Sequence, residues 1–253
     1  MQEFNSFQYE IFNGTMLGDG CLMLGKNSKN ASLSIVRAKK DLDFLKWEEK
    51  IFKDFITPSG IKHFQYRDSR TGNTYFSVRF RTKALPIFTE MRKKWYPENV
   101  KRVPEDFILT ANTLAKWICD DGSISEASTN SLSLKLATHS FDDNSIGILI
   151  RELSRIIPDG DFRIYEENNQ KTIHCFSITA KRIFRFIDNI FPPGMERKSG
   201  IWRNKKYRTF EDKQYTQCKF CLGSNTFKNG TAQNKQKFMC KSCRRQFYKS
   251  DKV

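Results

Sequence analysis

Two acidic residues of the chain lie at equivalent points of two similar segments. The stretches FNGTMLGDG and LAKWICDDG each end in an acid followed by glycine, Asp19-Gly20 and Asp121-Gly122, and the two acids are 102 residues apart. Each stretch has an apolar, helical character, and glycine ends helices because it adopts positive φ angles at little cost. We therefore expect each carboxylate at the C-terminal end of a helix, where the macrodipole is negative and a cation is stabilising.

This arrangement suits a divalent metal ion. If the two helices pack side by side, both carboxylates reach one end of the pair, where they and neighbouring carbonyl oxygens can bind a hard cation. Asp-Gly is also a common turn dipeptide, but two copies at equivalent points favour a site over two unrelated turns. A metal held in this way can position a water and stabilise a phosphate under attack, as phosphodiester hydrolysis requires. The predicted magnesium ligands are Gly18, Asp19, Asp120 and Asp121.

The elements that must position these acids occur twice in the same order. Each motif is followed by an alternating strand, at 32–35 and 131–136, and then by an amphipathic helix, with Asp41 and either Asp142 or Asp143 as candidate N-caps. Two more strands and a further helix complete each copy. We therefore expect an α+β protein with two αββαββα halves related by a pseudo-twofold axis. Such symmetry matches the local twofold axes of duplex DNA.

The polar faces of the expected strands indicate a nucleic acid partner. In residues 75–81 the tyrosine, the serine and two arginines share one face, whereas Phe76, Val78 and Phe80 share the other. Solvent exposure is the ordinary explanation for one such face, but arginines and hydroxyls on several strands suit a ribbon in a DNA groove. The strand residues predicted to bind DNA are Ser32, Ser34, Tyr75, Ser77, Arg79, Arg81, Ser131, Ser133, Lys135, Arg163 and Tyr165.

At the two acid-glycine stretches the chain resembles the LAGLIDADG homing endonucleases, in their single-chain form with two motifs. LAKWICDDGS has the family's initial Leu-Ala and its terminal acid and glycine, and GTMLGDG resembles the variant that closes with Gly-Asp-Gly. The likeness covers about residues 10–200. The chain departs from the family pattern at Lys116 and Asp120, where small residues are frequent, and at Cys119, where Asp is frequent.

The resemblance implies an activity and the residues that carry it. The family's metal-binding acids fall on Asp19 and Asp121, and its basic residues fall on Lys101, in Lys-x-Val-Pro, and on Lys198, in Met-Glu-Arg-Lys. These four are the predicted catalytic residues. The resemblance further implies that the two sheets form a DNA-binding saddle. It implies a monomeric, magnesium-dependent endonuclease that makes a staggered double-strand cut at a long specific target, with a mobile intron or a free-standing gene as host.

Four cysteines in the C-terminal region have the spacing of a structural zinc site. Two CxxC pairs, separated by 18 residues, can supply four thiolates in tetrahedral geometry and stabilise a segment too short to bury its own core. The module resembles the zinc ribbons of insertion-sequence transposases, and such a closed site does not catalyse. The predicted zinc ligands are Cys218, Cys221, Cys240 and Cys243. The predicted phosphate contacts here and in the preceding linker are Arg203, Lys205, Lys206, Arg244 and Arg245.

Charge and hydropathy restrict the class of protein. The net charge of +16 and the pI near 9.6 indicate a polyanionic partner, and residues 197–253 hold 16 Lys and Arg against 3 Asp and Glu. No apolar run approaches the roughly 18 residues of a membrane span, and the N-terminus lacks a secretory signal, so we expect an intracellular protein in a compartment that contains DNA. The expected divisions are a first half at 1–103, a second half at 104–198, a basic linker at 199–215 and a zinc ribbon at 216–253.

Two other functions are compatible with the sequence. A non-cleaving binder on the same scaffold, either an intron RNA maturase or a DNA-binding regulator, would use the basic tail and the zinc ribbon equally well. Asp19 and Asp121 favour the nuclease, because two carboxylates that face phosphates would repel them in a protein that only binds. A transposase is compatible with the ribbon, but the sequence offers no third acid in a suitable context.

Overall fold

The computed structural model describes residues 3–128, 131–187, 220, 226–232, 235–241 and 243–248. The chain forms two compact units, residues 1–204 and residues 205–253. The large unit contains both acid-glycine motifs. The predicted boundary at 103/104 divides this unit between its two repeats, and the linker predicted at 199–215 lies outside the described residues.

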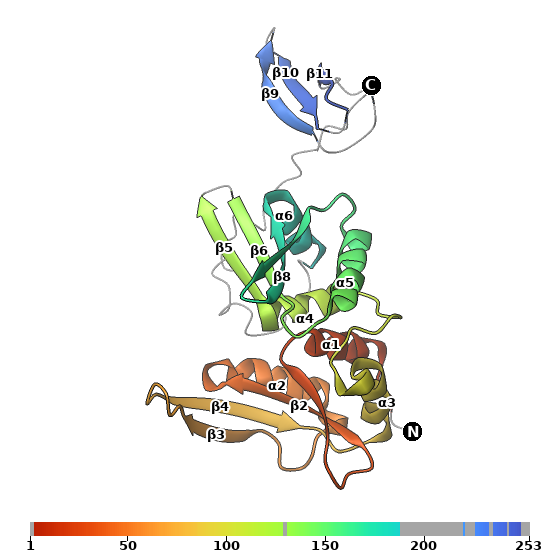
Figure 1. Ribbon diagram of the computed structural model, residues 1–253, viewed down its shortest axis with the longest axis vertical. Helices are drawn as coiled ribbons and strands as arrows, with labels where there is room; N and C mark the ends of the chain where they lie inside the picture. Colours follow the sequence, from red (N-terminus) through yellow and green to blue (C-terminus); the bar gives the residue numbers. More distant parts are fainter. Residues whose placement is uncertain are drawn as a thin grey trace. The chain divides into compact units, whose positions relative to one another are not determined.

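The first repeat of the large unit is one αββαββα copy (Figure 1). Its strands form an antiparallel sheet in the order β1-β2-β4-β3, and its main helices contribute Phe12, Phe44, Leu45 and Phe88 to the buried core. Short 3-10 turns precede and follow α2, and another follows α3. The elements are α1 (Ser6–Leu17), β1 (Gly20–Leu24), β2 (Ala31–Ala38), α2 (Leu42–Ile51), β3 (Lys62–Arg67), β4 (Thr74–Arg81) and α3 (Pro86–Trp95).

The second repeat has the same elements in the same order. Its sheet has the equivalent strand order, β5-β6-β8-β7, so the predicted α+β class and the internal duplication are confirmed. The elements are α4 (Ala111–Asp121), β5 (Gly122–Ser128), β6 (Ser131–Ala137), α5 (Asp143–Ile156), β7 (Phe162–Glu167), β8 (Gln170–Phe176) and α6 (Ser177–Phe186).

The helix caps agree only in part with the sequence analysis. Asp142 caps α5 by accepting a hydrogen bond from the Ser145 amide at 2.9 Å, as expected for one of the two candidates. Asp41 stands at the N-cap position of α2 but makes no capping hydrogen bond there, because the preceding 3-10 turn gives it a non-extended backbone, with φ −100° and ψ 21°. The prediction that Asp41 caps α2 is therefore wrong.

The two motif helices, α1 and α4, lie side by side in the core of the large unit (Figure 1). Glycine makes this close approach possible. A Cβ atom at Gly14 would lie 2.6 Å from Cβ of Lys116 and 2.7 Å from the carbonyl oxygen of Thr113, and a Cβ at Gly18 would lie 2.7 Å from Oδ2 of Asp120. These distances are well below van der Waals contact, so only glycine fits at either position.

The glycines that follow the acids have a different role from the one expected. Gly122 has φ −78° and ψ 137°, an ordinary extended backbone, and Gly20 is also outside the positive-φ region. A Cβ at Gly20 would instead lie 2.7 Å from the carbonyl oxygen of Thr15. The chain therefore needs glycine here because each strand begins directly against the last turn of its motif helix, and the prediction of a positive φ is wrong.

The small unit contains a three-stranded antiparallel sheet in the order β11-β10-β9. Cys240 and Phe247 form its buried centre, with Phe238 and Cys243 packed against them. The strands are β9 (Thr226–Ala232), β10 (Lys235–Cys240) and β11 (Gln246–Tyr248). Cys218 and Cys221, the other two predicted zinc ligands, lie outside the described residues, so the zinc site stays a prediction.

Candidate active site and nucleic-acid interface

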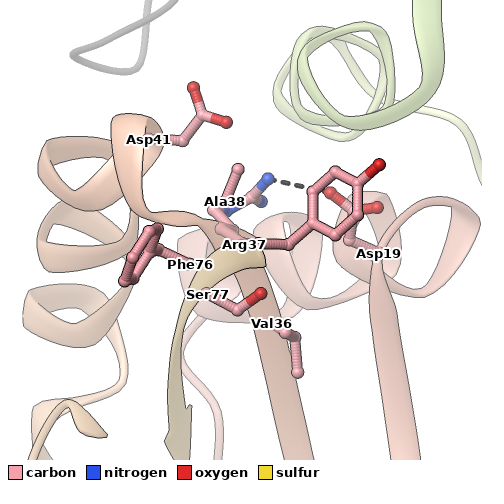
Figure 2. Close-up of a pocket in the computed structure, with 8 residues that line it drawn as sticks. Asp19, Val36, Arg37, Ala38, Asp41, Phe76 and Ser77 are labelled. Atoms are coloured by element: carbon pink, nitrogen blue, oxygen red, sulfur yellow. Dashed lines mark hydrogen bonds and ion pairs between the residues drawn. The ribbon is translucent and has the colours of Figure 1, made fainter. Parts of the chain in front are cut away.

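The two predicted catalytic acids lie at the C-terminal ends of the paired helices. Asp19 is in the tight connection between α1 and β1, and Asp121 is the last residue of α4, directly before β5. The side chain of Asp19 is 37% exposed and forms an ion pair with Arg37 of β2, with 2.9 Å between Oδ2 and Nη1 (Figure 2). The placement that the sequence predicted is therefore present in the fold.

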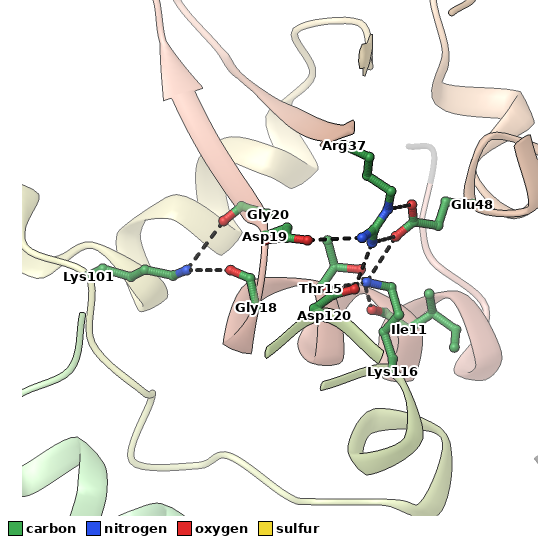
Figure 3. A network of polar contacts seen from close by, with 10 residues as sticks. All are labelled: Ile11, Thr15, Gly18, Asp19, Gly20, Arg37, Glu48, Lys101, Lys116 and Asp120. Carbon is green, nitrogen blue, oxygen red and sulfur yellow. Dashed lines mark hydrogen bonds and ion pairs between the residues drawn. The ribbon is translucent and has the colours of Figure 1, made fainter. Parts of the chain in front are cut away.

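Arg37 is the centre of a buried network that the sequence analysis missed (Figure 3). Its Nε and Nη2 donate to the two carboxylate oxygens of Glu48 at 2.7 Å each, and Nη2 also donates to Oδ1 of Asp120 at 2.7 Å. Lys116 donates to Glu48 at 2.9 Å and also binds Asp120. We call these five side chains the Arg37 cluster: Asp19, Arg37, Glu48, Lys116 and Asp120.

Pairing within the Arg37 cluster favours the charged forms of Arg37, Lys116 and Asp120. Burial alone would lower the pKa of Arg37 and of Lys116, but Asp120 and Glu48 outweigh it and raise both. Burial alone would raise the pKa of Asp120, but Arg37 and Lys116 hold it below its usual range. Mutual pairing therefore offsets the cost of removing these charges from water. The ring of Phe44 also lies 4.2 Å from the guanidinium carbon of Arg37, a favourable cation–π position.

The Arg37 cluster explains two residues, Lys116 and Asp120, that depart from the motif pattern. Lys116 and Asp120 stand one turn apart on α4, where they face Gly14 and Gly18 of α1. The glycines of one helix thus provide the space that the longer side chains of the other occupy. The carboxylate of Asp120 is bound to Arg37 and Lys116. The metal contact predicted at this position stays a prediction.

Lys101 reaches the same end of the helix pair from the loop that follows α3. Its ammonium nitrogen lies 3.3 Å from the carbonyl oxygens of both Gly18 and Gly20 (Figure 3). Burial lowers the pKa of Lys101, while Asp121 is the strongest of the neighbouring anions that oppose this shift, with Asp19 also contributing. The fold therefore brings three of the four predicted catalytic residues together. The fourth, Lys198, lies outside the described residues.

The donor atoms at this end suit a hard cation. The carbonyl oxygens of Gly18 and Gly20 already accept hydrogen bonds from a cationic group, the ammonium of Lys101. The carboxylates of Asp121 and Asp19 lie close enough to oppose part of the lowering of the Lys101 pKa that burial causes. Oxygen ligands of this kind are those that magnesium prefers. Among the described residues, no group of three or more histidine, cysteine or acidic side chains could hold a metal. A magnesium ion here would therefore need carbonyl oxygens or water as further ligands.

The open face of the first sheet carries six of the eleven strand residues predicted to bind DNA. The pairing of β3 with β4 places Phe64 opposite Ser77 and Tyr66 opposite Tyr75, so aromatic rings join the predicted polar row. The guanidinium carbon of Arg79 lies 4.4 Å from the ring centre of Phe64. This face therefore combines cations with exposed rings, both of which bind nucleic acids.

Two predicted contacts on this sheet differ from expectation. Ser32 and Ser34 share the face of Arg81, but they are only 7% and 4% exposed. Arg81 extends across to Met23 of the edge strand, with 3.2 Å between Nη2 and the sulfur. The hydroxyls of Ser32 and Ser34 therefore offer little surface to DNA. The prediction overlooked the covering of these short side chains by longer neighbours.

The second sheet presents an aromatic cluster around Arg163. The pairing of β6, β8 and β7 places Lys135, His174 and Arg163 in one row. The ring of Tyr165 lies against that of His174 in a tilted arrangement, with 4.4 Å between the ring centres. Arg163 lies over the ring of Phe176, 5.4 Å from its centre. Sequence reasoning assigned no faces to residues 173–178 because their alternation is poor. The reason is that β8 ends at Phe176 and α6 begins at the next residue. Ser133 also lies on this face, beside Phe176.

An open pocket of about 310 Å³ adjoins Asp19 on the first half (Figure 2). Arg37 and Asp19 lie at one side of it, and Phe76 and Ser77 of β4 lie at another. The pocket connects the acid to the open face of the sheet. The phosphate backbone of a nucleic acid that lay on that face could therefore reach the carboxylate of Asp19. The other lining residues are Val36, Ala38, Asp41 and Tyr75.

Residues 9–157 match the family model described as the LAGLIDADG DNA endonuclease family. The chain therefore belongs to this family. It is 26% identical to an uncharacterised protein of Methanocaldococcus jannaschii over 194 residues, which cover 74% of this chain and 71% of the relative. It is 28% identical over 147 residues to the cytochrome b mRNA maturase bI2 of Debaryomyces hansenii, covering 57% of this chain and 54% of the maturase, so it spans about half of that relative.

The fold is also that of a solved endonuclease. The structure of the homing endonuclease I-WcaI bound to its DNA recognition sequence aligns with a TM-score of 0.69 over 78% of this chain and 88% of that one, at 21% sequence identity. This similarity confirms the two-repeat architecture predicted from the sequence. No helix among the described residues is both long and apolar enough to cross a lipid bilayer.

Proposed function

We propose that this protein is a site-specific endonuclease that cuts both strands of duplex DNA with the aid of magnesium. The observation that supports this most strongly is the pair of acids, Asp19 and Asp121, at adjacent helix ends with Lys101 beside them. Family membership agrees with the activity. A protein that only bound nucleic acid would gain nothing from two carboxylates near the phosphates, because like charges repel.

Each residue of the site has a proposed role. Asp19 and Asp121, with the carbonyl oxygens of Gly18 and Asp120, hold the divalent ion. Bound magnesium supplies an activated water and a charge sink for the phosphate under attack. Lys101 stabilises negative charge that develops on the phosphate, since a fixed cation in a water-poor site is strongest in this role. Lys198 is proposed to do the same for the second half.

The two sheets and the small unit are proposed to bind the DNA. The rows that contain Arg79 on one sheet and Arg163 on the other supply base and phosphate contacts. The four cysteines at 218, 221, 240 and 243 hold a structural zinc ion, and the basic residues around them and in the linker extend the contact with the phosphate backbone. One chain carries both halves, so we expect it to act as a monomer inside the cell, wherever its target DNA resides.

Cleavage of a randomised duplex library by the purified protein tests this proposal. With magnesium we expect double-strand cuts at one recurrent sequence, and with EDTA none. Asp19→Asn and Asp121→Asn should each abolish cutting while DNA affinity changes little, because the fold and the sheets are unchanged. Cutting that persists in either variant would show that the acids are not the metal ligands, and binding without cutting by the wild type would refute the nuclease.

The second candidate is an RNA maturase that does not cleave DNA. The similarity to the maturase of Debaryomyces hansenii supports it, as do the exposed rings of Phe64 and Tyr66, because unpaired bases stack on aromatic side chains. A DNA-binding regulator is the non-cleaving alternative on the same scaffold. Comparing binding to intron RNA and to duplex DNA, with cutting scored in both, separates the three functions.

A further inference from the structure

The Arg37 cluster contains three acidic and two basic side chains, and its members differ in their exposure to solvent. Arg37 and Lys116 balance Glu48 and Asp120, and all four side chains are at most 1% exposed. Asp19 is the fifth member and the one with an exposed side chain. The exposed end of the cluster is therefore the carboxylate of Asp19, the acid that is proposed to bind the metal ion.

Arg37 connects this acid to the other half of the protein. Its Nη1 donates to Asp19, which follows α1, and its Nη2 donates to Asp120 of α4, the residue before Asp121. The guanidinium group is planar and rigid, so these bonds fix the position of the Asp19 carboxylate relative to the end of α4. Glu48 of α2 in turn fixes the guanidinium with two bonds of 2.7 Å.

The second half has no such arginine at the equivalent place. Strand pairing aligns Gly20 with Ile35 in the first half and Gly122 with Leu136 in the second. Two residues further along, Arg37 therefore corresponds to Thr138, a buried residue whose hydroxyl donates to the carbonyl oxygen of Lys171 at 2.7 Å. In the part of the chain that the structure describes, Arg37 of the first half thus contacts residues at both motif helix ends.

We propose that Arg37 is a positioning residue that makes the two half-sites unequal. It holds the Asp19 carboxylate directly, whereas near Asp121 it binds the neighbouring residue, Asp120. This inference rests on the proposed endonuclease function. It predicts that disturbing Arg37 slows hydrolysis of one DNA strand more than the other, because a small displacement of a reacting group lowers a rate steeply.

Arg37→Lys tests the proposal, because it keeps the positive charge but replaces a fork of donors with a single ammonium group. We expect one strand to be cut at least about tenfold more slowly than the other, so that nicked DNA accumulates, with DNA affinity close to that of the wild type. Each strand of the target duplex carries its own label, and both rates are measured in single turnover. The matched control is Arg155→Lys in the second half. This change also removes paired guanidinium hydrogen bonds, which Arg155 donates to Glu152 and to the carbonyl oxygen of Leu109.

The strand ratio separates positioning from a general loss of structure. A variant that is merely less stable would slow both strands by the same factor, and that result would overturn the proposal. So would a strand ratio in Arg37→Lys equal to that of the wild type or of Arg155→Lys. If the wild type cuts no DNA, the proposed function fails, and a second measurement then decides whether Arg37 links the halves.

That measurement is a thermodynamic cycle without DNA. The unfolding equilibrium constants of Asp19→Asn, Asp120→Asn and the double variant are compared with that of the wild type, with Asp120→Glu as a substitute if Asp120→Asn does not fold. If one guanidinium joins the two acids, the double variant should differ from the product of the single effects by more than about threefold. Effects that multiply independently would show that Arg37 does not link the halves.

Discussion

Gly14 of α1 offers a sharp test of the helix pairing that places the two acids. A Cβ atom at this position would lie 2.6 Å from Cβ of Lys116 and 2.7 Å from the carbonyl oxygen of Thr113. Carbon atoms in contact are normally about 3.5–4.0 Å apart, so Gly14→Ala must separate α1 from α4 by about 1 Å. One obstacle is backbone and the other is the stem of a buried lysine held in the Arg37 cluster, so neither can move aside.

The expected magnitude follows from two opposing effects. Overpacking of a close-packed core costs about 1–3 kcal/mol, whereas replacing a helical glycine with alanine stabilises by about 0.5–1 kcal/mol. We expect Gly14→Ala to lower the free energy of unfolding by about 1–2 kcal/mol, measured by urea denaturation. Cleavage should fall as well, because the acids and the Arg37 cluster move apart with the helices.

Gly147 in α5 provides a matched control for this substitution. It is also a helical glycine, but a Cβ atom there would meet nothing within 4 Å. Gly147→Ala should therefore raise the free energy of unfolding by about 0.5–1 kcal/mol and leave cleavage unchanged. If Gly14→Ala proved as stable as the wild type, or if both variants changed stability in the same direction, the close approach of α1 and α4 would be refuted.

Four further experiments test the site. Although burial alone would raise the pKa of Asp120, Arg37 and Lys116 hold it low, so the folded state should lose this stabilisation as pH falls below about 4. The free energy of unfolding is measured as a function of pH for the wild type and for Asp120→Asn. The same pH dependence in both proteins would contradict this role of Asp120. Lys101→Met should slow single-turnover cleavage by about 10–100-fold with little change in affinity, and an unchanged rate would exclude its electrostatic role. Arg163→Lys should relax specificity at about one base pair in a binding-site selection, because lysine cannot form the bidentate contact; an unchanged consensus would remove Arg163 from base recognition. Deleting residues 205–253 should weaken DNA binding and reduce its salt dependence in a titration, whereas equal affinity would mean that the small unit does not contact DNA.

The sequence by itself determined the architecture and the place of the acids. The 102-residue offset between the two acid-glycine motifs and the repeated order of elements predicted two αββαββα halves, which the fold confirms. These features are local: apolar periodicity sets each helix or strand, and the motif places each acid at the end of its own helix. Duplication then implied the pairing of the helices.

Sequence signals for the Arg37 cluster were present but pointed to no particular partners. Arg37 follows Leu33 and Ile35 on the core face of β2, and Glu48 lies on the apolar face of α2 with Phe44. A charged residue at a buried position predicts a partner of opposite charge, although it does not say where in the chain that partner lies.

Only the tertiary structure shows that the contacting surfaces of the two motif helices are complementary in shape. The offset makes Gly14 equivalent to Lys116 and Gly18 equivalent to Asp120, which in sequence resembles simple divergence from the motif. In the fold, each equivalent pair packs face to face, so the glycines of one helix make room for the ionic side chains of the other. Complementarity of this kind depends on which surfaces meet, and contacts between residues about 100 positions apart are fixed by packing rather than by local pattern.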